Sequence, residues 1–115
     1  TLNYLIAAVL LAISMGSSAM SLGQYNEARN DERQWAYVKE YLNGLGDGMS
    51  VSSATLIQQN RVPLYCLPKE RVLNHDDYIN LLDTFIAENP FLPELPIESI
   101  LLKSLITAFP CPKTQ

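Results

Sequence analysis

The sequence predicts an all-α fold, a small compact domain of about four helices with one disulfide bond, preceded by a signal peptide. Apolar residues recur at helical spacing in three long segments, and no segment alternates in the manner of a strand. Prolines fall between these segments, where they end helices. Two cysteines lie in the C-terminal half, the number that one disulfide needs.

The N-terminal segment is typical of a secretion signal. The first 24 residues carry no charged side chain, and an unbroken apolar run extends from Tyr4 to Ile13. This run has the length of a signal-peptide core and is short for a membrane span. Ser17 and Ala19 are small residues before a possible cleavage point after Ala19. We therefore expect residues 1–19 to be a signal peptide and residues 20–115 to be a helical domain in the periplasm, without a stable membrane anchor after cleavage. A membrane-anchoring or buried apolar helix is the alternative.

The charge balance excludes some partners. Twelve acidic and eight basic residues give a net charge of −4, and all of them follow the uncharged N-terminal segment. An acidic domain of this kind is not expected to bind nucleic acid or an anionic membrane surface.

The first long helix is predicted within residues 30–60, with Asn30 or Asp31 as its cap. Its apolar stripe consists of Trp35, Val38, Leu42, Leu45, Met49 and Leu56. A second stripe contains Tyr37, Tyr41, Gly44, Gly48 and Ser52. Small residues at this spacing indicate that another helix packs closely, either from the same chain or from a second copy. Alternatively, the helix ends at Gly44 or Gly46 and another begins near Ser50 or Ser52.

Two further helices are predicted in the second half of the chain. Pro68 can begin one short helical turn over residues 68–73. Asn74 then caps a helix that Pro90 ends, with an apolar stripe of Ile79, Leu82, Phe85 and Ile86. The last helix starts at Pro96, stops before Pro110 and is expected to bury Ile97, Ile100, Leu101, Leu105 and Ala108.

The two cysteines, Cys66 and Cys111, are expected to form a disulfide. An exported domain meets an oxidising compartment, where paired cysteines in a small domain usually bond. The bond would close a loop of 45 residues (111 − 66). A metal site or a catalytic thiol is the alternative, but His75 is the only histidine and a closed zinc site needs four ligands.

No catalytic constellation stands out, so we expect no catalytic residues, no metal site and no cofactor. His75 beside Asp76 could act as an oriented general base, or could be a solvated residue at a helix start. Six acids lie between Asp76 and Glu98 with no lysine or arginine among them. The helix face of Asp76, Asn80 and Asp83 is either a solvated face or a docking surface for a basic partner.

The connection from Glu88 to Glu94 is the predicted partner-binding segment. Pro90 and Pro93 stiffen it, so that little conformational entropy is lost on binding. Its expected contact residues are Glu88, Asn89, Phe91, Leu92 and Glu94. Phe91 could instead fold back onto the core, and the loop Asn60 to Leu64, with Arg61, is the competing candidate.

Several motifs in this order give the chain a family resemblance. They are the aromatic-rich helix running into Gly44 and Gly48, then "CLP" at residues 66–68, "FIAENP" at 85–90 and "ILLKSLITAFPC" at 100–111. The chain resembles the Rap/Tai family of periplasmic immunity proteins, which protect bacteria from cell-wall amidases delivered by type VI secretion.

The resemblance implies a small helical fold, an intramolecular disulfide and a homodimer. It also implies that the protein is not an enzyme but an inhibitor that occludes the active site of a secreted peptidoglycan amidase. Together with the small-residue stripe, the resemblance places the dimer interface at Tyr37, Tyr41, Gly44 and Gly48. The alternative function is that of an acid-stress periplasmic chaperone with a similar disulfide-stapled fold, and a wall-processing enzyme is a third possibility.

Overall fold

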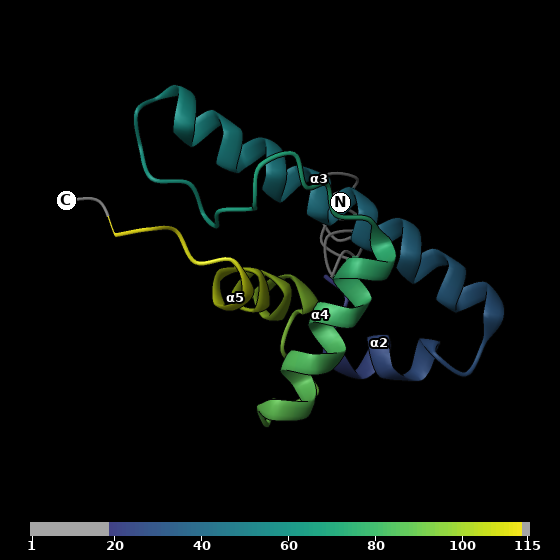
Figure 1. Ribbon diagram of the computed structural model, residues 1–115. Helices are drawn as coiled ribbons and strands as arrows, with labels where there is room; N and C mark the ends of the chain where they lie inside the picture. Colours follow the sequence, from purple (N-terminus) through teal and green to yellow (C-terminus); the bar gives the residue numbers. More distant parts are fainter. Residues whose placement is uncertain (1–18, 114–115) are drawn as a thin grey trace, which may run out of the picture.

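The computed structural model describes residues 19–113 and contains four helices within them (Figure 1). These are α2 (Leu22–Ala28), α3 (Glu32–Gln58), α4 (His75–Glu88) and α5 (Ile97–Ala108). No strand occurs in the described range, so the predicted all-α class is confirmed. None of the helices in residues 19–113 combines the length and apolar character needed to span a bilayer. Apart from its last residue, the predicted signal peptide lies outside the described residues.

The longest helix, α3, continues through all three of its glycines. Asp31 caps it by accepting hydrogen bonds from the backbone N–H groups of Arg33 and Gln34, at 2.9 and 3.1 Å. Because α3 is unbroken from Glu32 to Gln58, the predicted continuation of the helix past Gly44 is confirmed. One side of α3 faces the core through Val38 and Leu42, which are fully buried.

Helix α4 begins as the sequence predicts. The Asn74 side chain accepts a hydrogen bond from the backbone N–H of Asp77 at 3.1 Å, and the Asp77 carboxylate accepts one from the backbone N–H of Asn74 at 2.9 Å. This reciprocal capping box satisfies two donors that a helix start would otherwise leave unpaired. Helix α5 follows Pro96 without a side-chain cap.

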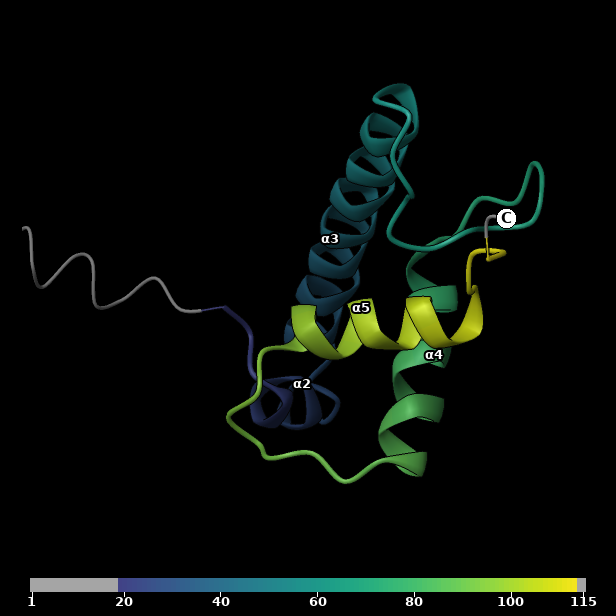
Figure 2. The same ribbon diagram turned by 90° about the vertical axis from the view of Figure 1, so that its left-hand side faces the viewer.

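The core lies where α4 packs against both α3 and α5, and α2 closes one end by packing on α3. Figure 2 shows α5 running across α4. The largest fully buried side chains come from all four helices: Tyr25, Val38, Leu42, Leu82, Ile97, Ile100, Leu101 and Leu105. Each contributes about 1.5–3 kcal/mol of hydrophobic stabilisation, which explains how so few helices hold together.

Three details differ from the sequence-based expectations. The fourth helix is α2, which was not predicted from the sequence. Residues 68–73 are not helical as expected but contain a turn, closed by a hydrogen bond from Arg71 N–H to the Pro68 carbonyl at 3.1 Å. Ala108 was expected to be buried but is exposed, and Ser104 is buried instead. Ser104 is accommodated because its hydroxyl donates to the Leu101 carbonyl at 2.8 Å.

Candidate functional site

The disulfide joins Cys66 to Cys111, as predicted, with the two Cα atoms 4.8 Å apart. The backbone N–H of Cys66 also donates to the carbonyl of Phe109 at 2.8 Å. These two links fasten the end of α5 to the long connection between α3 and α4. Every cysteine in the described residues is bonded, so none offers a thiol nucleophile there.

The Glu88–Glu94 connection divides into a buried part and an exposed part. Phe91 folds back onto the core with its ring centroid 5.6 Å from that of Phe85. Asn89 donates a side-chain hydrogen bond to the Phe85 carbonyl at 3.0 Å and so finishes α4. Leu92 projects outward with 69% of its surface exposed, and Glu88 and Glu94 are exposed as well. Leu92 is therefore the apolar side chain that this segment offers to a partner.

The acidic face of α4 is less available than its sequence indicates. Asp83 accepts hydrogen bonds from Arg29 at 2.6 Å and from the Tyr25 hydroxyl at 2.9 Å. The Arg29 guanidinium also lies over the Trp35 ring, 4.5 Å from its centroid. Burial, reinforced by the hydrogen bond to Asp83, raises the pKa of Tyr25 well above its usual value. Asp83 thus fastens α4 to α2 and is not a free docking charge.

The outer face of α3 is open along its small-residue stripe. Apart from its chain neighbours and the backbone of its own helix, a Cβ atom added at Gly44 or Gly48 would meet no heavy atom of the described chain within 4 Å. Tyr37 is 64% exposed, and its ring is tilted by 35° to that of the half-buried Tyr41, with the two centroids 6.2 Å apart. The four predicted dimer residues therefore make one accessible surface, and no helix within residues 19–113 covers the two glycines.

Gly46 is the exception among the α3 glycines, because it faces inward. A Cβ there would overlap the ring of Tyr78, which is only 3% exposed. Here the missing side chain lets α4 approach α3 closely. Burial of this ring raises the pKa of Tyr78 to about 12.

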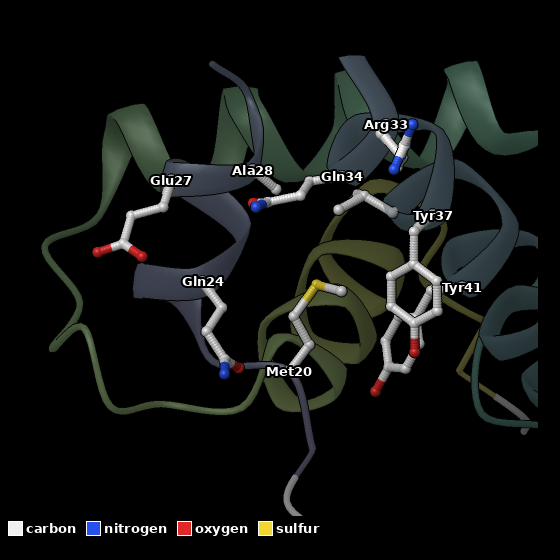
Figure 3. Close-up of a pocket in the computed structure, with 9 residues that line it drawn as sticks. Met20, Gln24, Glu27, Ala28, Arg33, Gln34, Tyr37 and Tyr41 are labelled. Carbon is white, nitrogen blue, oxygen red and sulfur yellow. The ribbon is translucent and has the colours of Figure 1, made fainter. Parts of the chain in front are cut away.

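A groove of about 570 Å³ adjoins the open face of α3 (Figure 3). Helix α2 contributes Gln24 and Glu27 to one wall, and α3 contributes Tyr37 and Tyr41 to the other. The Met20 side chain points into the space between them. The groove and the tyrosines form a continuous surface, because the same two rings belong to both.

A second groove of about 410 Å³ runs between α4 and α5. Arg71, Asp77 and Glu88 supply charges to it, and Thr84 and Thr107 supply hydroxyl groups. Glu88 is the only predicted contact residue that lines it. No sequence motif indicates this groove, because residues on its two sides, such as Thr84 and Thr107, are far apart in the chain.

The connection between α3 and α4 presents two exposed loops. In the competing loop Asn60–Leu64, Arg61 and Val62 are exposed, and Leu64 is half-buried. In the turn after Pro68, Glu70 adopts a left-handed backbone with φ of 67°, and Val72 is 87% exposed. A non-glycine residue in this conformation is strained. Sequence reasoning did not single out Glu70 or Val72.

His75 lies at the first position of α4, within 3.2 Å of the Asn43 amide nitrogen and 3.4 Å of Asp76. Among residues 19–113, Asn43 and Asp76 are the side chains that contact its ring nitrogens. Within residues 19–113, no three potential metal-ligating side chains gather at one point.

Comparisons of this chain with protein-family models, with curated protein sequences and with solved structures found no match.

Proposed function

We propose that this chain is a periplasmic immunity protein that binds a type VI secreted peptidoglycan amidase and occludes its active site. The observation that carries the proposal is the ordered set of sequence motifs around the Cys66–Cys111 disulfide. An intact disulfide in a small domain fits an oxidising compartment. The exposed loops before and after α4 are accessible to a partner protein, as inhibition by direct binding requires.

The proposed contact element is the Glu88–Glu94 connection, with Leu92 as its apolar anchor. Its first half is held by Phe91 and Asn89, so Leu92 is presented from a fixed base. A preorganised loop loses little entropy when a cleft closes around it. Glu88 and Glu94 flank the anchor and can make charge-assisted hydrogen bonds to a cationic histidine in that cleft.

We also propose that the protein is a homodimer through the open face of α3. Tyr37 and Tyr41 would supply aromatic contact area, and Gly44 and Gly48 would let a second helix approach. Light scattering tests this: the wild type should have twice the mass of one chain at high micromolar concentration. Gly48→Leu should return it to a monomer without loss of helicity. A monomeric wild type at that concentration contradicts the dimer.

The immunity function is tested by co-expression in the bacterial periplasm. The probe is a type VI secreted Cys-His peptidoglycan amidase, whose gene we expect beside the gene of this protein. The complete chain should restore growth of cells that express the amidase, and Leu92→Asp should not. Val62→Asp is the matched control, because Val62 is similarly exposed at 62% but lies in the competing loop. If both variants restore growth, the contact surface lies outside both loops. Lysis of cells that contain abundant wild-type protein would contradict the immunity role.

The alternative, an acid-stress chaperone, is favoured by the number of exposed apolar side chains. Tyr37, Val51, Ile57, Val62, Val72, Leu92 and Ile106 are all accessible. A chaperone of this kind should suppress the aggregation of unrelated proteins at low pH, whereas an amidase inhibitor should not. A light-scattering assay with an acid-denatured client protein separates the two functions.

A further inference from the structure

The chain directly after the expected cleavage point is fixed to the start of α5. Three backbone hydrogen bonds make this connection: Ile97 N–H to the Met20 carbonyl at 2.8 Å, Leu22 N–H to the Leu95 carbonyl at 2.9 Å and Gly23 N–H to the Pro93 carbonyl at 2.9 Å. Ser21 and Pro96 form the antiparallel bridge between them. Met20 is therefore held in place, although it would be the first residue after cleavage.

The neighbouring Glu98 has an oxygen atom without a partner. Oε2 of Glu98 is the one buried side-chain nitrogen or oxygen in the described residues that makes no hydrogen bond. Leaving such an acceptor unpaired destabilises the folded state. Glu98 lies in the first turn of α5, where the helix dipole favours a negative charge. The dipole explains the charge at this position, but it supplies no donor for the buried oxygen.

We propose that signal-peptide cleavage supplies this donor, because the new α-ammonium group of Met20 forms an ion pair with the Glu98 carboxylate. Hydrolysis of the Ala19–Met20 bond adds water, leaving a carboxylate on Ala19 and an ammonium group on Met20. The amide nitrogen of Met20 has one proton before cleavage, whereas the ammonium group has three and a positive charge.

The hydrogen bond from Ile97 N–H to the Met20 carbonyl places the residue before Glu98 directly against Met20. The Met20 nitrogen lies about 3–4 Å from its own carbonyl oxygen, which in turn is bonded to Ile97 N–H. Glu98 is the next residue, and a glutamate carboxylate extends about 4–5 Å from its Cα. Cleavage also frees the nitrogen to turn toward the carboxylate, because Ala19 no longer holds it. The mature domain would thus be completed by its own processing.

The test compares two proteins that differ only before Met20. One begins at Met20 with a free amine, released from a fusion by a protease that leaves no extra residue, and the other has a short Gly/Ser extension. Urea unfolding should give a folding equilibrium constant about tenfold larger for the free-amine protein, as expected for a charge-assisted hydrogen bond to a buried oxygen. Glu98→Gln, made in both proteins, should abolish most of this difference.

Two results would overturn the proposal. The first is an equal stability of the free-amine and extended proteins that carry Glu98, or a difference that persists undiminished in Glu98→Gln. The second is a mass spectrum of the exported protein in which the mature chain begins at a residue other than Met20. The inference rests on the proposed export but not on amidase binding, so failure of the inhibitor role would leave both measurements unaffected.

Discussion

Replacing Gly46 with alanine should destabilise the single chain, whereas the same change at Gly44 or Gly48 should stabilise it when unfolding is measured at a concentration below that at which the proposed dimer forms. All three glycines lie inside α3, where alanine is favoured over glycine by about 1 kcal/mol. At Gly44 and Gly48 of the single chain the added methyl group enters open space. At Gly46 it overlaps the Tyr78 ring, which has little room to move because the ring is buried.

The expected magnitudes follow from these two terms. Overpacking a filled core costs about 1–3 kcal/mol, and the helix propensity of alanine offsets about 1 kcal/mol of it. Gly46→Ala should therefore lose about 1 kcal/mol of unfolding free energy, and should be about 2 kcal/mol less stable than Gly48→Ala. In a domain of this size, the loss corresponds to a fall of about 4–8 °C in Tm.

Urea unfolding followed by circular dichroism and by Trp35 fluorescence measures these differences. The control measures Gly46→Ala in a protein that already carries Tyr78→Leu. Because leucine is smaller than tyrosine, the added alanine should cost no stability relative to Tyr78→Leu alone. If Gly46→Ala is as stable as Gly48→Ala, α4 does not pack on α3 at this point, and the arrangement of the core is wrong.

The remaining predictions concern the disulfide, Tyr78 and Glu70. Replacing Cys66 and Cys111 together with serine should cost about 4 kcal/mol, because the 45-residue loop regains its freedom in the unfolded chain, and urea unfolding measures it. Because burial raises the pKa of Tyr78 to about 12, its contribution to stability should be complete below pH 10 and lost as the pH rises toward 12. Tyr78→Phe should weaken that part of the pH dependence, and an unchanged profile would assign it to other groups. Glu70→Gly should stabilise the protein by about 1 kcal/mol in thermal unfolding, since glycine tolerates the left-handed backbone, and a loss of stability would contradict the strained turn.

The sequence predicted three of the four helices because their signals are local. Apolar spacing identified the buried side of α3, and the capping residues located its start and that of α4. The missed helix, α2, follows directly after an apolar segment that we assigned to a signal peptide. Its signal was nevertheless local: Ser21 and Gln24 form a capping box before Tyr25, which is fully buried.

The candidate site was harder to predict, because its side chains are placed by contacts between distant segments. Nothing near Asp83 in the sequence indicates that Arg29 neutralises it from α2. The roles of Phe91 and Leu92 could not be separated either, since only packing on Phe85 decides which one turns inward. Gly46 and Gly48 look alike in the sequence, yet one contacts the core and the other is open.

Titration of the proposed target, a type VI secreted Cys-His amidase, with this protein tests the inhibitor role most directly. With peptidoglycan fragments as substrate, the wild-type protein should abolish cleavage near one chain per enzyme. Leu92→Ala combined with Glu94→Ala should weaken binding by more than about 2 kcal/mol, the loss expected for an anchor, while the circular dichroism spectrum stays unchanged. Arg61→Ala combined with Val62→Ala should inhibit like the wild type. An amidase that keeps its full activity in excess wild-type protein would contradict the proposed function.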